Sequence, residues 1–294
     1  MTLIESTVHA GLPAPVRLFH LTDLHITRSD ESDCPYAVRQ QAERRLVFRR
    51  PDEEPSESLA DAFLREGAEA DCLVMTGDII DAPSAGNLAF LREKFTRPDC
   101  FYVTGNHDWC FPPDHPAGAE GQRAFRPLLE QASGFPIDFC TRRVGGLTLI
   151  GLDNSEYQVT AEQAARVFSV LERGEPSILC CHVPFYCGTL WESARDYWRE
   201  PILVGCPDEV LAQGFARPRS LRPTAETAAF VERLKTFPNL AAILAGHIHY
   251  NHTDRFSEYT VQIVTQTAVH APIAERNGRE VPHEPGNARW VYVD

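Results

Sequence analysis

Eight histidine, aspartate and asparagine side chains follow short apolar runs at five places in the chain. They are Asp23, His25, Asp78, Asn106, His107, His182, His247 and His249. Imidazole, carboxylate and carboxamide groups without a thiolate suit Mn, Fe, Zn, Co or Ni better than Ca or Mg alone. Seven donors drawn from this set already exceed the needs of one open tetrahedral site. They fit two metal ions that share a bridging carboxylate, as in two-metal hydrolases.

The apolar runs before these groups have the length and composition of buried strands. We predict strands at 16–25, 72–76, 99–104, 147–153, 177–181 and 240–245, a strand-like pattern from 260 and a closing strand at 290–293, with helices near 56–64, 87–95, 119–132, 160–171 and 224–236. Alternating strands and helices are typical of a parallel sheet, whose strands end at one edge. The polar groups are therefore expected to converge at that edge.

Side chains alternate between the two faces of a strand, and this alternation places the two histidines of the first predicted strand on different faces. In an extended chain, side chains two apart point the same way. Asp23 and His25 are therefore expected to face one side together, in a chelating arrangement. His20 is out of phase with that pair and is expected to be a hydrogen-bonded core histidine.

The order of these motifs resembles the calcineurin-like metallophosphoesterase superfamily, over about residues 16–270. The motifs are Asp23-x-His25, Gly77-Asp78-x-x-Asp81, Gly105-Asn106-His107-Asp108, His182 and Gly246-His247-x-His249. The resemblance implies an α/β fold: a four-layer αββα sandwich of two mixed β-sheets flanked by helices. It places a dinuclear metal site at the carboxyl ends of the strands. We take residues 1–294 as one such domain.

The resemblance also implies a role for each motif residue. Asp23, His25 and His249 would bind one metal ion, Asn106, His182 and His247 would bind the other, and Asp78 would bridge them. His107 would stabilise the transition state or protonate the leaving oxygen. Asp81 would orient His107, a carboxylate–imidazole pairing that fixes the tautomer; a plain helix-start aspartate is the alternative. Asp108 is expected to be structural.

These roles predict a metal-dependent phosphoester hydrolase. Two divalent or trivalent transition-metal ions (Mn, Fe or Zn) would neutralise the phosphate oxygens and activate a bridging hydroxide for in-line attack. A small phosphodiester, nucleotide-like or other, is the expected substrate. The alternatives are a phosphomonoesterase or phosphoprotein phosphatase of the same fold, a nuclease, and a protein-binding scaffold without activity.

Composition limits the partners. The 294-residue chain has a formal net charge of −13, which disfavours long nucleic acid and an anionic membrane surface. No apolar run reaches the ~20 residues that a membrane-spanning helix needs, and no signal peptide is evident. The nine cysteines include no Cys-x-x-Cys pair and are expected to be reduced thiols. A cytoplasmic protein is therefore expected.

Two irregular segments follow metal motifs and are expected to be insertions beside the site, at about 28–55 and 187–222. In the first, the Arg44-Arg45 pair is expected on a solvated face. In the second, Trp191 is expected to stack or pack against substrate, and Arg195 or Arg199 to hold a phosphate. His252 is a further candidate for substrate contact. A purely structural role for these side chains is the alternative.

Overall fold

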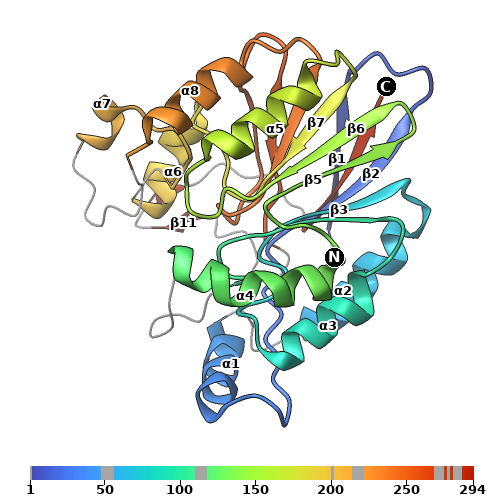
Figure 1. Ribbon diagram of the computed structural model, residues 1–294, viewed down its shortest axis with the longest axis vertical. Helices are drawn as coiled ribbons and strands as arrows, with labels where there is room; N and C mark the ends of the chain where they lie inside the picture. Colours follow the sequence, from blue (N-terminus) through green and yellow to red (C-terminus); the bar gives the residue numbers. More distant parts are fainter. Residues whose placement is uncertain are drawn as a thin grey trace.

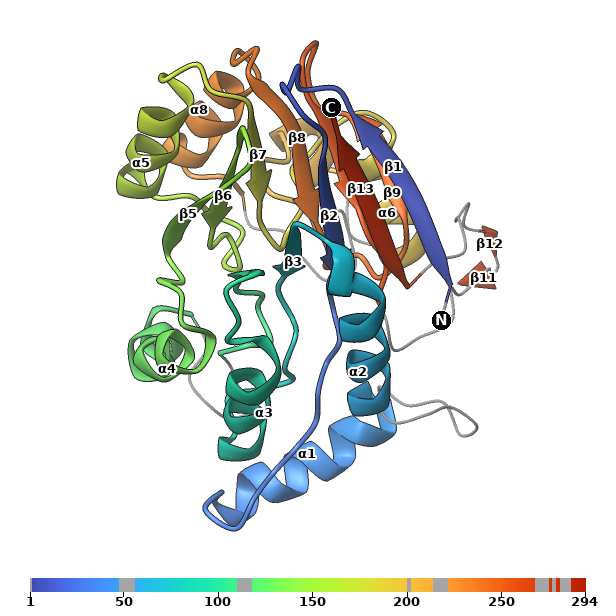
Figure 2. The same cartoon turned by 90° about the vertical axis from the view of Figure 1, so that its right-hand side faces the viewer.

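Two β-sheets packed face to face form the centre of the molecule, and helices cover both outer faces (Figures 1 and 2). The computed structural model describes residues 2–47, 56–109, 118–199, 202–213, 222–267, 275–276, 279–280 and 287–294. The first sheet has the order β1-β13-β2-β3-β4, and the second has the order β5-β6-β7-β8-β10-β9. Both sheets mix parallel and antiparallel neighbours, which confirms the predicted four-layer α/β class.

The strands that carry the motifs are parallel within each sheet. In the first sheet the bounds are β1 Leu3–Val8, β13 Ala288–Val293, β2 Val16–Leu21, β3 Cys72–Thr76 and β4 Cys100–Val103. In the second they are β5 Phe139–Val144, β6 Leu147–Leu152, β7 Ser177–Cys180, β8 Leu240–Ala245, β10 Val261–Val264 and β9 His252–Arg255. A separate two-stranded ribbon pairs β11 Glu275–Arg276 with β12 Arg279–Glu280. Because β2, β3 and β4 run parallel, as do β7 and β8, their carboxyl ends share one edge.

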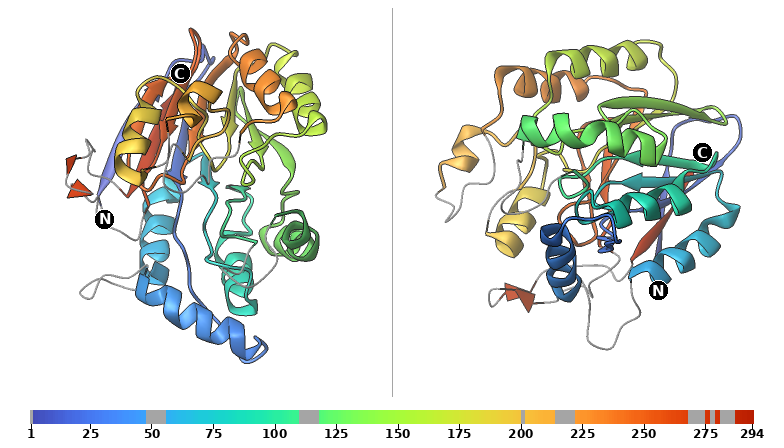
Figure 3. Two further views of the ribbon diagram at one scale, coloured as in Figure 1. Left: turned by 90° about the vertical axis from the view of Figure 1, so that its left-hand side faces the viewer. Right: turned by 60° about the horizontal axis from the view of Figure 1, so that its bottom comes forward.

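Central strands are buried on both sides, which explains their continuous apolar sequence. In β3, Cys72 and Val74 pack between the sheets, whereas Leu73 and Met75 pack against the outer helices. The helices on this side are α2 Ser56–Glu66, with a 3-10 turn at Gly67–Glu69, α3 Ala85–Phe95 and α4 Gly118–Ser133. The opposite face carries α5 Ala161–Leu171 and α8 Ala225–Leu234. The left panel of Figure 3 shows α5 and α8 to one side of the strands and α2, α3 and α4 below them.

Several local predictions are confirmed. Thr160 caps α5 through a capping box with Gln163, each side chain accepting the other's backbone N–H. This arrangement satisfies two N–H groups that the first helical turn leaves unpaired. The predicted closing strand is β13, which lies between β1 and β2 in the first sheet.

Other segments differ from the prediction. The 28–55 segment contains a helix, α1 Pro35–Val47, and residues 48–55 lie outside the described part. Helix α1 begins at Pro35. Proline is favourable there because it lacks an N–H group, and the first helical turn would leave that group unpaired in any case. The 187–222 segment contains α6 Leu190–Trp198 and α7 Asp208–Leu211; residues 200–201 and 214–221 lie outside the described part.

Three strands of the two sheets, β1, β5 and β9, were not predicted, because their part-exposed faces carry polar residues. The β11–β12 ribbon was not predicted either. Every cysteine in the described ranges is a free thiol, as expected. Among the described residues, no helix combines the length and the apolar composition that a bilayer-spanning segment requires.

Candidate metal centre

The loops that leave the strands turn sharply before they present their polar side chains. Strand β2 ends at Leu21, and Asp23 and His25 have φ values of 52° and 45°. The expected extended geometry of this pair is therefore wrong, although the two side chains do converge. Asp78, His247 and His249 are also left-handed, with φ values of 51°, 71° and 63°. Such conformations cost free energy in non-glycine residues and are concentrated at functional sites.

Two glycines allow the loops to approach one another. A side chain on Gly246 would collide with the Thr22 hydroxyl and the Asp23 carboxylate. Gly77 has a φ of 86°, and a side chain there would collide with the Gly105 backbone. The close contact between loops from different strands therefore requires glycine at both positions.

One group of candidate ligands comes from the ends of β2 and β8. Oδ1 of Asp23 lies 3.2 Å from Nε2 of His249 and 3.8 Å from Nε2 of His25. The two imidazole Nε2 atoms are 3.3 Å apart. Asp23 and His25 are fully buried, and the three ligand atoms lie close enough together to share one cation.

A second group comes from the ends of β3, β7 and β8. Nδ1 of His182 is 2.7 Å from the carbonyl oxygen of Thr76 and donates to it, so Nε2 is the nitrogen left for a ligand. That Nε2 lies 3.2 Å from Oδ2 of Asp78 and 3.2 Å from Nδ1 of His247. The other nitrogen of His247 is 2.7 Å from the hydroxyl of Tyr157. Each ring is thus oriented by a partner outside the group.

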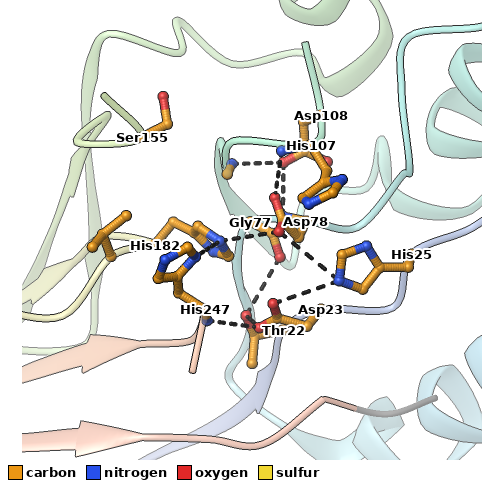
Figure 4. Close-up of polar contacts among 12 residues, drawn as sticks. Thr22, Asp23, His25, Gly77, Asp78, His107, Asp108, Ser155, His182 and His247 are labelled. Carbon is orange, nitrogen blue, oxygen red and sulfur yellow. Dashed lines mark hydrogen bonds and ion pairs between the residues drawn. The ribbon is translucent and has the colours of Figure 1, made fainter. Parts of the chain in front are cut away.

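Asp78 lies between the two groups (Figure 4). Its Oδ2 is 3.9 Å from Nε2 of His25 and 3.2 Å from Nε2 of His182. Its Oδ1 accepts a hydrogen bond of 2.8 Å from the backbone N–H of His107. The preceding residue, Asn106, is in the same anchored loop, and its amide oxygen is buried. One carboxylate oxygen therefore faces both imidazoles.

The electrostatics show an excess of buried negative charge. Burial by itself would lower the pKa of His25, but hydrogen bonds to Asp23 and Asp81 raise it to about 10. The pKa of His182 is raised to about 9, because the Asp78 charge outweighs burial. Burial would raise the pKa of Asp23, yet the His249 and His25 imidazoles hold it well below its usual range. The carboxylates therefore hold protons on the two imidazoles wherever no other cation is bound.

This donor set fits metal ions on two further grounds. Oδ1 of Asp23 is buried and faces the Nε2 atoms of His249 and His25, at 3.2 and 3.8 Å. The facing Nε2 atoms of His25 and His249 cannot satisfy one another without a proton or a cation between them. Imidazole and carboxylate ligands without thiolate match first-row transition metals.

Asp81 contacts both His25 and His107. Its Oδ1 is 3.1 Å from Nδ1 of His25 and 2.8 Å from Nδ1 of His107. Arg44 of α1 binds the same carboxylate at 2.6 and 2.9 Å. Arg44 therefore does not lie on a solvated face as expected, whereas its neighbour Arg45 pairs with Glu57 near the surface.

Asp108 anchors the loop backbone. Its carboxylate accepts the backbone N–H groups of Asp78, Ile80 and Gly105 at 2.9, 3.0 and 2.6 Å. Burial, followed by the nearby Asp78 charge, raises its pKa to about 7. These contacts agree with the expected structural role.

The candidate substrate residues lie along and beside α6. The Arg195 guanidinium pairs with Asp196 and stacks over the Trp191 ring at 4.8 Å. Arg199 is exposed and ends α6 with a φ of 60°. His252 lies 3.3 Å from the Thr189 hydroxyl and 3.6 Å from Asp254, at the start of the helix.

Three further side chains contact the candidate centre. Trp198 packs its ring edge-on against His249, with centroids 5.7 Å apart, and donates to the Ile248 carbonyl. Tyr157 and Arg44 hold His247 and Asp81. Sequence spacing does suggest that Arg44 shares a helical face with Gln41, but nothing local signals Tyr157.

Comparison with solved structures shows the same fold elsewhere. A dimetal phosphatase from Danio rerio is 14% identical, with a TM-score of 0.53, and the alignment covers 87% of this chain and 89% of that one. A purple acid phosphatase from yellow lupin (Lupinus luteus) seeds is 10% identical, with a TM-score of 0.50, covering 96% of this chain and 54% of the lupin chain. A search of curated proteins finds no match.

The family comparison covers most of the motif-bearing chain. The profile described as calcineurin-like phosphoesterase matches residues 16–251, which include every candidate ligand. The structure supplies groups of side chains suited to the metal centres that this family uses. The chain belongs to the calcineurin-like phosphoesterase family.

Proposed function

We propose that this protein is a dinuclear metallophosphoesterase that hydrolyses a small phosphodiester. The observation that carries the proposal is the position of Asp78, whose Oδ2 faces Nε2 of His25 on one side and Nε2 of His182 on the other. A single oxygen shared by two imidazole-containing groups is the geometry of a bridging ligand. Bound there, two metal ions would neutralise phosphate oxygens and lower the pKa of a shared water.

The protein's own residues then have distinct tasks. Asp23, His25 and His249 hold one cation, Asn106, His182 and His247 hold the other, and Asp78 contributes to both. His107 lies beside this centre, with Nδ1 held by Asp81. We assign its other ring nitrogen to the leaving ester oxygen, which needs a proton as the bond to phosphorus breaks.

The inserted helices favour a small substrate. Arg44 of α1 lies 3.3 Å from Nδ1 of His107, and Trp198 of α6 packs against His249. Helices α1 and α6, from the two inserted segments, therefore reach the candidate centre. The net charge of −13 opposes a long polyanion. These two features support a small phosphoester over a phosphoprotein or a nucleic acid.

Hydrolysis of matched chromogenic esters tests the proposal. With added Mn²⁺, bis-p-nitrophenyl phosphate is expected to be hydrolysed faster than p-nitrophenyl phosphate, and both faster than a phosphopeptide. Asp78→Asn is expected to lose both metal binding and hydrolysis. Preference for the monoester would favour a phosphomonoesterase, and activity with neither ester would favour a binding scaffold. Full activity with two metal ions retained in Asp78→Asn would refute the bridging role.

A further inference from the structure

Helix α1 binds Asp81 through both its backbone and its side chain. Gln41 donates a hydrogen bond of 2.8 Å to the Asp81 carbonyl oxygen. One turn later, Arg44 donates from Nε to Oδ2 at 2.6 Å and from Nη2 to Oδ1 at 2.9 Å. Asp81 is completely buried, and the Arg44 side chain is 24% exposed. The right panel of Figure 3, viewed from the end where α1 lies, shows this helix in dark blue.

Four nitrogen atoms converge on the Asp81 carboxylate. Three of them, Nη2 of Arg44 and Nδ1 of His25 and His107, contact Oδ1. The fourth, Nε of Arg44, contacts Oδ2. An ionised carboxylate only accepts, so each imidazole must present N–H at Nδ1 and direct Nε2 elsewhere. The planar guanidinium fork fixes the rotation of the carboxylate, which a single contact would leave free.

The two imidazoles held by Asp81 belong to different parts of the proposed reaction. His25 is a candidate metal ligand, and His107 is the candidate partner of the leaving oxygen. Their rings meet edge to face, with centroids 4.9 Å apart and an interplanar angle of 82°. A rotation of the Asp81 carboxylate would therefore displace both rings at once.

We propose that Arg44 is a positioning residue of the active site, acting through Asp81 on His107 and His25. The expected effect on catalysis rests on the proposed function. The contacts among Arg44, Asp81, His107 and His25 do not depend on it. On this proposal α1 is part of the active site, because it supplies the Arg44 guanidinium that holds the Asp81 carboxylate. In this role Arg44 does not contact the substrate or the reacting atoms.

Arg45 provides a matched control. It lies on the same helix, is 47% exposed and pairs with Glu57 instead of Asp81. Arg44→Gln and Arg45→Gln remove the same charge and keep a helix-forming residue. Differences between the two variants therefore report the Asp81 contact and not the loss of a positive charge from α1.

The first test uses no activity. In histidine-labelled, zinc-loaded protein, imidazole NMR is expected to show a hydrogen-bonded Nδ1–H signal from His107, identified by its loss in His107→Gln. Arg44→Gln is expected to shift or lose that signal, and Arg45→Gln to keep it. An unchanged signal in Arg44→Gln overturns the proposal. This comparison tests the positioning role of Arg44 even if the protein hydrolyses no phosphoester. Such a lack of hydrolysis would contradict only the proposed function.

The second test is a double-mutant cycle on bis-p-nitrophenyl phosphate at saturating Mn²⁺. Arg44→Gln is expected to lower kcat by about 10–100-fold, with KM within about threefold, as for other residues that orient metal-site ligands. In the His107→Gln background the same change is expected to cost less than about threefold, because residues acting as one unit are not additive. An undiminished loss in that background with metal affinity unchanged, or a loss confined to KM, would place Arg44 on the substrate and contradict the proposal.

Discussion

The hydroxyl of Tyr157 lies 2.7 Å from Nε2 of His247, and the two rings meet edge to face with centroids 5.5 Å apart. This contact uses the outer nitrogen of the imidazole. Nδ1 is consequently the nitrogen that faces His182, at 3.2 Å. A phenol from the loop after β6 thus selects which atom of a candidate ligand is available for a metal ion.

Tyr157→Phe should weaken metal binding without unfolding the protein. The change removes one hydroxyl and leaves the ring, so His247 loses its partner and its preferred orientation. Loss of such an outer contact typically lowers metal affinity by about 10–100-fold. Chelator competition would measure the affinity of each site, with Tyr292→Phe as the control, since that hydroxyl contacts Glu5 of β1. Equal affinities in the two variants would contradict the orienting role.

Gly246→Ala should disrupt the contact between the β2 and β8 loops. The added methyl group would collide with the Thr22 hydroxyl and the Asp23 carboxylate. Overpacking of this kind costs about 1–3 kcal/mol, and it would also displace Asp23 from His249. Urea unfolding and metal titration would measure both effects.

Gly174→Ala is the comparison for that experiment. Gly174 has a φ of 74° but open space around it, so alanine there carries backbone strain alone. We expect unchanged metal affinity in Gly174→Ala and reduced affinity in Gly246→Ala. Similar metal affinities would show that the close approach at Gly246 is not needed to hold the ligands.

The strands and the ligand types could be predicted from sequence because both leave local signals. The buried run before Asp78 is apolar on both faces, and Thr160 with Gln163 marks a helix start within four residues. By contrast, β1 and β13 form a parallel pair between opposite ends of the chain. Of these two strands, only the closing strand β13 has a strongly apolar local pattern. Its partner β1 was therefore not predicted.

The geometry at Asp23 and Arg44 could not be predicted for a different reason. A strand pattern implies extended backbone, but the left-handed turns at Asp23 and His25 are imposed by contacts with the Gly77–Asp78 loop. Likewise, an arginine in a charged helix has no local feature that reveals a carboxylate 37 residues away. Both features depend on tertiary contacts, whose partners a single sequence does not identify.

Metal binding should strengthen as pH rises. The pKa values of His25 and His182 are raised to about 10 and about 9, so both imidazoles hold protons at neutral pH before a cation binds. A metal ion requires neutral imidazole and must displace those protons. Affinity should therefore rise with pH until about 9–10. Calorimetry in buffers of different ionisation enthalpy at pH 7 should detect proton release, and binding without release would contradict these pKa shifts.

His20 should make the folded state less stable in acid. Burial, reinforced by the Arg289 charge, lowers the pKa of His20 to about 3, and its two nitrogens contact the Thr76 and Thr265 hydroxyls at 2.8 and 2.9 Å. Below the ordinary value of about 6.5, the unfolded chain gains a proton that the folded protein cannot accept. Stability present above pH 6.5 is therefore lost as pH falls towards 3, by up to about 1.4 kcal/mol per pH unit.

His20→Gln isolates this contribution. The variant loses the imidazole hydrogen bonds and should be less stable than wild type at pH 7, but it has no proton to gain. The difference in unfolding free energy should shrink by about 2–3 kcal/mol between pH 7 and pH 4.5, measured by urea unfolding. A difference that stays constant across this range would mean that folding does not lower the pKa of His20.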